Sequence, residues 1–67
     1  MASDLKRSLT IAGHRTSLSL EPEFWEALQR AALSRGLTAA NLVAEIDLTR
    51  GERNLSSAVR VWLLQNG

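Results

Sequence analysis

The sequence contains no cysteine and a single histidine among its 67 residues, and these absences exclude most ways of cross-linking a small fold. Disulfide bonds and thiolate metal sites require cysteine, and a structural zinc site built on histidines requires more than His14. A chain of about this length buries only about 60% of the surface that it exposes when unfolded, so most such chains need an additional constraint. The constraint left to this chain is association with a second copy, and we therefore expect a homodimer.

Long hydrophobic runs are also absent. The longest candidate, Val61 to Leu64, has four residues, whereas a membrane-spanning helix needs about 20. No apolar stretch follows the basic pair Lys6-Arg7, so the N-terminus does not have the pattern of a secretory signal. We expect a cytoplasmic protein without a membrane partner.

Neither sign of charge dominates, because eight lysines and arginines are set against seven acids, for a net charge of +1. The distribution is uneven: residues 1–20 carry +2, residues 21–52 carry −3 and residues 53–67 carry +2. A dimer that placed two N-terminal segments side by side would carry roughly +4 on one surface. The near-neutral average therefore conceals a basic N-terminal segment.

Motifs for catalysis or metal binding are missing as well. The sequence has no Ser–His–Asp or Cys–His set, no Gly-rich phosphate loop and no metal-ligand spacing. Its neighbouring acids, such as Glu23 and Glu26, are explained by compensation of a helix dipole. We expect no enzymatic activity, no metal ion and no cofactor.

What the sequence does contain is a short segment with the period of a half-buried strand, residues 14–20. Its polar face holds Arg15, Ser17 and Ser19, and its other face holds Thr16, Leu18 and Leu20. Ser8 to Ile11 also alternate. The sequence leaves open whether they extend this strand, form a second short strand that turns back at Ala12-Gly13, or belong to a loose arm.

Three helices are predicted after the strand. They run from Pro22 to Arg35, from the N-cap residue Thr38 to Gly51, and from Leu55 to Leu64. The last is apolar nearly all round, and a monomer of this size has too little protein to bury it. The residues expected in the core or in a dimer interface are Leu18, Leu20, Phe24, Trp25, Leu28, Leu42, Val43, Ile46, Val59, Trp62 and Leu63.

Two ion pairs are also expected. Asp47 and Arg50 are three residues apart on one helix and can pair on its exposed side. Arg60 lies within the apolar third helix, so we expect it to pair with an acid such as Glu45 or Asp47, or with the partner chain.

The order of these elements resembles a ribbon–helix–helix protein of the MetJ/Arc type over residues 14–50. The shared features are the alternating strand, the proline at the strand–helix corner, Gly36 after the first helix and the N-cap Thr38 of the second. The run from Gly13 to Trp25, with Ile46-Asp47 and Asn54 to Arg60, is similar to a bacterial subfamily of uncharacterised function that has a C-terminal third helix.

The resemblance implies an α+β, mainly α fold, with one N-terminal strand followed by three helices. Two chains would form an intertwined homodimer whose strands pair into a two-stranded antiparallel ribbon. Residues 14–67 would form this ribbon–helix–helix domain with its additional C-terminal helix. Residues 1–13 would precede it as a basic N-terminal arm or short strand.

The resemblance also implies a function, that of a sequence-specific DNA-binding protein and small transcriptional regulator. Its dimeric ribbon would enter the major groove of double-stranded DNA, with base contacts from Arg15, Ser17 and Ser19. Phosphate contacts would come from the first turn of the second helix, Thr38, Ala39, Ala40 and Asn41. A basic arm that follows the DNA backbone would add Lys6 and Arg7.

A second interpretation keeps the dimeric fold and gives it another role. Two of the three reader positions are serines, where family members more often carry longer donors. The protein would then be an interaction module, antitoxin-like or docking on a larger regulator, with weak or no DNA binding. Its contact surface would be the apolar third helix, from Leu55 to Leu64.

Overall fold

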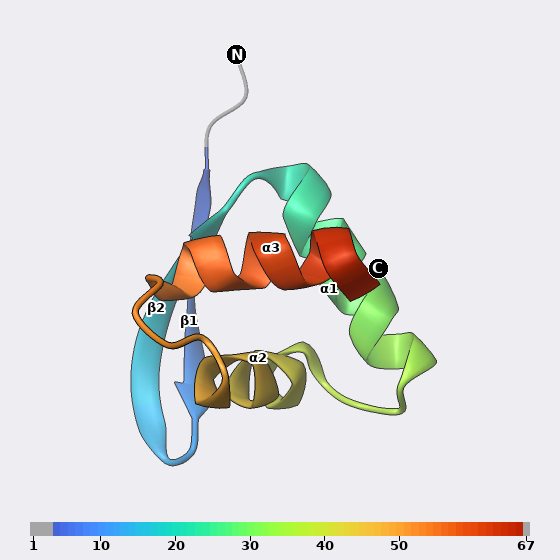
Figure 1. Ribbon diagram of the computed structural model, residues 1–67. Helices are drawn as coiled ribbons and strands as arrows, with labels where there is room; N and C mark the ends of the chain where they lie inside the picture. Colours follow the sequence, from blue (N-terminus) through green and yellow to red (C-terminus); the bar gives the residue numbers. More distant parts are fainter. Residues whose placement is uncertain (1–3, 67) are drawn as a thin grey trace.

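The computed structural model describes residues 4–66, which form two strands followed by three helices (Figure 1). The elements are β1 (Leu5–Ile11), β2 (His14–Leu20), α1 (Pro22–Ser34), α2 (Ala39–Leu48) and α3 (Leu55–Asn66). The two strands form a hairpin, and the helices gather on one side of it (Figure 1). The three helices agree with the sequence patterns apart from small differences at their ends.

The hairpin corrects the prediction of one N-terminal strand, because the chain supplies two. β1 and β2 pair antiparallel from Leu5 opposite Leu20 to Ile11 opposite His14. Only Ala12 and Gly13 connect them, with φ of 52° and 82°. A two-residue turn with positive φ at both positions is the type I′ turn, whose twist matches that of the strands. The alternating segment Ser8–Ile11 is therefore part of a second strand that turns back at this point.

The hairpin has one apolar face, and this face lies against the helices. Ile11, Leu18 and Leu20 are buried there, at 6%, 1% and 0% exposure. α2 packs on β1, and α1 and α3 pack on β2. The strands thus contribute to the same core as the helices, and the opposite face of the hairpin remains outside it.

The core joins all five elements in a single cluster of buried side chains. Its members are Ile11, Leu18, Leu20, Trp25, Leu28, Ala32, Leu42, Val43, Ile46, Ala58, Val59 and Leu63. The residues predicted for the core or a dimer interface are all in this cluster except Phe24 and Trp62, which are partly buried and pack against it. One chain therefore buries much of what the sequence pattern suggested a partner would cover.

Trp25 fastens the hairpin to α1. Its side chain is 4% exposed, and its Nε1 donates a hydrogen bond to the backbone oxygen of Leu5 over 2.8 Å. The guanidinium of Arg7 lies over the indole ring, 5.1 Å from the ring centroid, which is cation–π geometry. Both contacts come from β1, so the first strand is held by polar interactions as well as by apolar packing.

The two predicted ion pairs have different outcomes. Arg50 pairs with Asp47, as the three-residue spacing predicts. Arg60 pairs with Glu21, at 3.4 Å between Nη1 and Oε1, instead of with Glu45 or Asp47. Glu21 is the N-cap residue of α1, and α1 and α3 pack together, so the fold rather than the local sequence selects this partner.

No helix within residues 4–66 has both the length and the apolar character needed to cross a membrane.

Candidate nucleic-acid interface

The polar face of the hairpin carries the three residues for which the family resemblance implies base contacts. Arg15, Ser17 and Ser19 alternate along β2 and point away from the buried residues Leu18 and Leu20. Residues directly opposite each other in an antiparallel pair share a face. The register therefore adds a second row of three side chains from β1: Thr10 opposite Arg15, Ser8 opposite Ser17, and Lys6 opposite Ser19.

These six residues, which we call the outer face, are Lys6, Ser8, Thr10, Arg15, Ser17 and Ser19. All are exposed except Ser19, which is half-buried. Each carries a hydrogen-bond donor, two carry a positive charge and none is acidic. The ion pairs among residues 4–66 do not involve Lys6 or Arg15.

The dimensions of the outer face suit the major groove, which admits a two-stranded ribbon. Lys6 and Arg15 lie at opposite ends of the face, four register positions apart. This separation is roughly 13 Å at about 3.3 Å per residue. Arg and Lys can both donate to guanine O6 and N7, and serine and threonine hydroxyls can donate or accept. The face thus offers a long donor at each end and short hydroxyls between them.

Lys6 and Arg7, predicted together as phosphate contacts, lie on opposite faces of β1. Lys6 is opposite Ser19 on the outer face, whereas Arg7 is opposite the buried Leu18. The Arg7 guanidinium lies over Trp25, although the residue as a whole is exposed. Adjacent residues of a strand point to opposite sides, so only one of the two basic residues can join the outer face.

The first turn of α2, residues 38–41, is not brought next to the outer face within one chain. The Thr38 Oγ1 accepts a hydrogen bond from the Asn41 backbone nitrogen over 3.1 Å, so the threonine caps the helix. Figure 1 shows the chain entering α2 at the end farther from the hairpin and leaving it at the nearer end. Ala39 and Ala40 are half-buried and Asn41 is exposed at that far end.

Ser8 and Thr10 are the residues of the outer face that the predicted contacts do not include. The sequence feature that could have placed them on this face is the alternation of Ser8–Ile11, followed by a glycine at the turn. That signal is weak because the strongest hairpin turns have asparagine or aspartate before the glycine, and this chain has Ala12.

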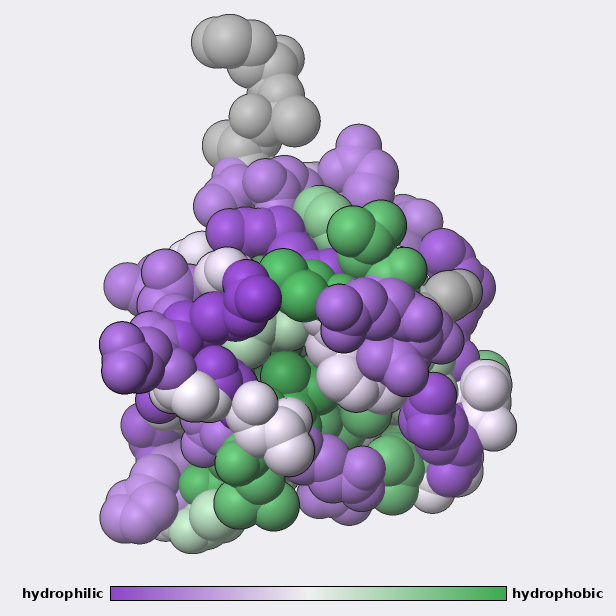
Figure 2. Space-filling view, viewed as in Figure 1, coloured by the Kyte–Doolittle hydropathy of each residue, from purple (hydrophilic) through white to green (hydrophobic). Residues whose placement is uncertain are grey.

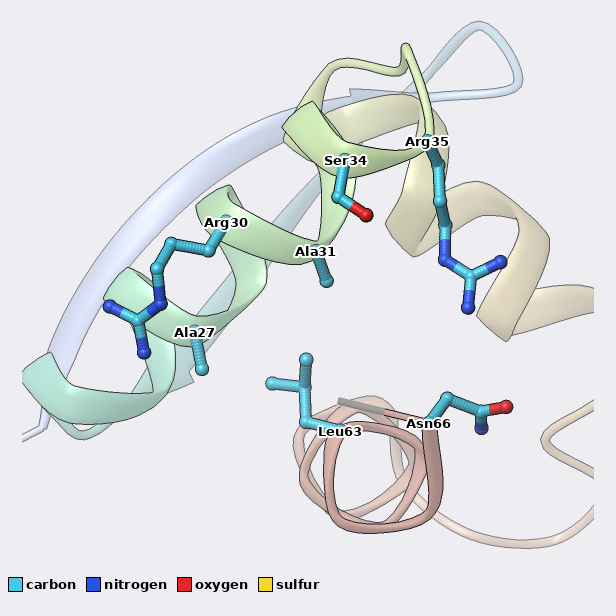
Figure 3. Close-up of a pocket in the computed structure, with 7 residues that line it drawn as sticks. All are labelled: Ala27, Arg30, Ala31, Ser34, Arg35, Leu63 and Asn66. Atoms are coloured by element: carbon cyan, nitrogen blue, oxygen red, sulfur yellow. The ribbon is translucent and has the colours of Figure 1, made fainter.

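A pocket between α1 and α3 is separate from the hairpin. Ala27 and Ala31 face Leu63 across it, and polar groups surround the opening (Figure 3). The other lining residues are Arg30, Ser34, Arg35 and Asn66. The Arg35 guanidinium stacks on Trp62 at 4.8 Å from the ring centroid, so it is already engaged. Within residues 4–66, His, Asp and Glu side chains do not gather in threes that could hold a metal ion.

A second hollow between the same helices is apolar. It is lined by Phe24, Ala27, Arg60, Val61, Leu63 and Leu64. Leu64 is 85% exposed there. Figure 2 shows hydrophobic side chains between hydrophilic ones on the side of the molecule that carries α3. This hollow is the surface that the second interpretation requires.

Comparison with known proteins gives one result. A family model described as a ribbon–helix–helix domain matches residues 5–66, from the first residue of β1 to the last of α3. No curated protein and no solved structure matches the chain. Ribbon–helix–helix domains generally bind DNA, regulate transcription, form dimers and are typically not enzymes. By the extent of the match, the chain belongs to the ribbon–helix–helix domain family.

Proposed function

We propose that this protein is a sequence-specific DNA-binding protein and a small transcriptional regulator, acting as a homodimer in the bacterial cytoplasm. The observation that carries the proposal is the outer face of the hairpin, an exposed polar surface with two positive charges and no acid. The hairpin enters the major groove, where Arg15 reaches guanine and Ser17 and Ser19 contact neighbouring base edges.

The buried face of the hairpin supports this assignment. Leu18 and Leu20 hold β2 on the helices, so the alternate residues Arg15, Ser17 and Ser19 are presented on a rigid strand. Rigid presentation lowers the entropy lost when side chains are fixed on a ligand. Thr38 caps α2 with its hydroxyl, which accepts the Asn41 N–H, and we propose that the first turn of α2, residues 38–41, contacts a DNA phosphate in the dimer.

Fluorescence anisotropy with duplex DNA tests the proposal. The full chain is titrated against fragments of a bacterial genome at about 50 mM salt and again at about 200 mM, because phosphate contacts make affinity fall steeply with salt. We expect binding at low micromolar protein that weakens at the higher salt. Absence of any salt-dependent binding under these conditions contradicts the proposal.

A matched pair of variants locates the surface. Arg15→Ala removes a charge from the outer face, and we expect affinity for the preferred duplex to fall about tenfold and base preference to relax. Arg30→Ala removes the same charge from an exposed position on α1, 3.9 Å from Glu26. It is expected to change affinity less than about twofold, since screening weakens charges far from the DNA. Equal losses in both variants would mean that net charge, not the hairpin, determines binding.

The apolar hollow between α1 and α3 supports a second candidate function, docking of a protein partner. Leu64 is 85% exposed at its rim, and Val61 and Phe24 line it. If docking is the function, a partner is retained at high salt and lost in Leu64→Asp, while Leu48→Asp, equally exposed on α2, retains it. Salt-sensitive DNA binding that Leu64→Asp leaves unchanged favours the hairpin instead.

A further inference from the structure

We infer that β1 of each chain flanks the DNA-reading ribbon of the dimer on its outer side, which makes a four-stranded sheet with β2 of the two chains at its centre. The central strands read bases, and Lys6, Ser8 and Thr10 of β1 contact phosphates at the walls of the major groove. The inference rests on the proposed DNA-binding homodimer. It deepens that proposal, because it gives the two strands of each hairpin different tasks.

The free edge of β2 is the first argument. The two-residue turn makes Ile11 and His14 a hydrogen-bonded pair, and such pairs alternate with non-bonded pairs along an antiparallel ladder. The backbone groups of Arg15, Ser17 and Ser19 therefore point away from β1. In the part of the chain that the structure describes, backbone hydrogen bonds outside the regular elements do not engage them. A second strand can pair along this edge while β1 keeps its place.

The charges favour β2 over β1 as the strand that pairs with the partner. Charged side chains, lysine above all, protect a strand edge from pairing with another chain. β1 carries Lys6 and Arg7, whereas residues 16–20 of β2 are uncharged. Ser17 is the middle residue of β2. Antiparallel pairing centred there keeps Arg15 and the partner's Arg15 roughly 13 Å apart along the ribbon, so the two charges do not meet.

The attachment of β1 to its own chain is a further argument. Ile11 is 6% exposed in the core, and α2 packs on this strand. The Leu5 carbonyl accepts the Trp25 Nε1 hydrogen bond, and the Arg7 guanidinium lies over the indole ring. These contacts hold both ends of β1. A partner strand therefore joins the sheet beside β2 and leaves β1 as the outer strand.

The width of the sheet separates the tasks of the strands. Neighbouring strands are about 4.8 Å apart, so two β2 strands fit side by side in a groove about 12 Å wide. The two β1 strands are about 14 Å apart and lie over the walls of the groove, where the phosphates are. Lys6, Ser8 and Thr10 face the DNA there with one charge and two hydroxyls, groups that commonly bind phosphate oxygens. Arg7 faces Trp25 instead.

Cysteine cross-linking tests the strand order, because the chain contains no cysteine. Ser17→Cys places a thiol at the centre of β2, and Ser8→Cys places one directly opposite on β1, where the side chain is also exposed. After mild oxidation without DNA, we expect a disulfide-linked dimer from Ser17→Cys, since the facing Cα atoms are about 5.5 Å apart. Ser8→Cys is expected to stay unlinked, since its two thiols are about 14 Å apart.

Two results of the cross-linking overturn the inference. One is a linked dimer from Ser8→Cys, which would place β1 at the centre of the sheet. The other is the absence of a linked dimer from Ser17→Cys. Circular dichroism of both variants verifies that the compared proteins are folded.

Titrations with duplex DNA test the task of β1. Lys6→Gln and Arg15→Gln remove the same charge from the outer face, one on β1 and one on β2. Lys6→Gln is expected to lower affinity about tenfold for the preferred duplex and for an unrelated one alike, and to reduce the slope of log affinity against log salt by about 2 per dimer. Arg15→Gln is expected to lower the ratio of the two affinities about tenfold. A similar fall of this ratio in Lys6→Gln would make Lys6 a base reader and contradict the inference.

The outcomes distinguish this inference from the function on which it rests. If the wild-type chain binds no duplex, the proposed function fails, and the phosphate contacts of β1 fail with it. If the wild type binds and Arg15→Gln lowers the ratio, while Lys6→Gln changes neither affinity nor salt dependence, the function stands and the inference is wrong. A Ser17→Cys cross-link, together with an equal loss of affinity for both duplexes in Lys6→Gln, is the result that supports it.

Discussion

The fourteen strand residues of the hairpin divide between two faces that have opposite physical roles. The inner face buries Leu18 and Leu20 at 1% and 0% exposure, whereas Arg15 and Ser17, next to them in the chain, are exposed. Burial makes the inner residues necessary for folding. The outer residues are not needed for the core, and they are the surface on which the proposed DNA contacts lie.

The largest contrast between the faces is expected for adjacent substitutions in β2. Leu18→Ala removes a fully buried side chain and is expected to lower the free energy of unfolding by about 2–5 kcal/mol. Ser17→Ala, one residue away and exposed, is expected to change it by less than about 0.5 kcal/mol. Urea denaturation measures both. Similar losses in the two variants would mean that the outer face is also part of a buried interface.

The polar link between the inner face and α1 is expected to have the next largest effect. Trp25→Phe keeps an aromatic ring but removes the hydrogen bond to the Leu5 carbonyl. The cost is expected to be about 1–2 kcal/mol, because a partly buried carbonyl loses its partner. Trp62→Phe is the control, since Trp62 is only half-buried at the edge of the core, and it is expected to cost less. Equal unfolding midpoints for Trp25→Phe and wild type would exclude the link.

The turn between the strands allows a change in the stabilising direction. Ala12 has a φ of 52°, a left-handed conformation that costs an L-residue about 1–2 kcal/mol and that asparagine and aspartate tolerate better. Ala12→Asn gives the preferred sequence of a type I′ turn and is expected to raise the free energy of unfolding by about 0.5–1 kcal/mol. Gly13→Ala, at a φ of 82°, is expected to lower it by about 1 kcal/mol. If the two strands were connected by another turn type, Ala12→Asn and Gly13→Ala would not change the free energy of unfolding in opposite directions.

The smallest expected effects are those of the charges on the two faces of the hairpin. Lys6→Gln and Arg15→Gln are expected to change stability by less than about 0.5 kcal/mol, because both residues are exposed on the outer face. Arg7→Gln removes a cation from the Trp25 ring and is expected to cost about 0.5–1 kcal/mol. Thermal unfolding monitored by tryptophan fluorescence ranks the three. A Lys6 variant less stable than the Arg7 variant would reverse the assignment of the faces.

The sequence was sufficient to predict β2, its two faces and the three helices, because alternation and helix caps are local signals. The sequence did not decide whether the residues before Ala12 form a second strand, since the Ala12-Gly13 turn is a weak hairpin signal and Ser8–Ile11 is a short alternating run. The Glu21 partner of Arg60 and the distance of Thr38 from the hairpin depend on how the helices pack. Local patterns carry no information about such tertiary neighbours.

The burial of the third helix depends on the fold in the same way. Its pattern is apolar nearly all round, but the buried residues of α3 are Ala58, Val59 and Leu63. The hairpin and the other two helices of the same chain cover that stripe. Leu64 remains exposed on the opposite side. The composition of a helix therefore shows how much apolar surface it has, and the fold decides how much of it is covered.

The most direct test of the account is a titration of the ¹⁵N-labelled chain with duplex DNA at about 50 mM salt, where phosphate contacts are strong, followed by amide chemical shifts. The account predicts that the largest shifts fall in β1 and β2, at Lys6, Ser8, Arg15 and Ser17, and that they spread little to α3. Shifts confined to residues 38–41 of α2, or to Val61 and Leu64 of α3, with the hairpin unchanged, would contradict it.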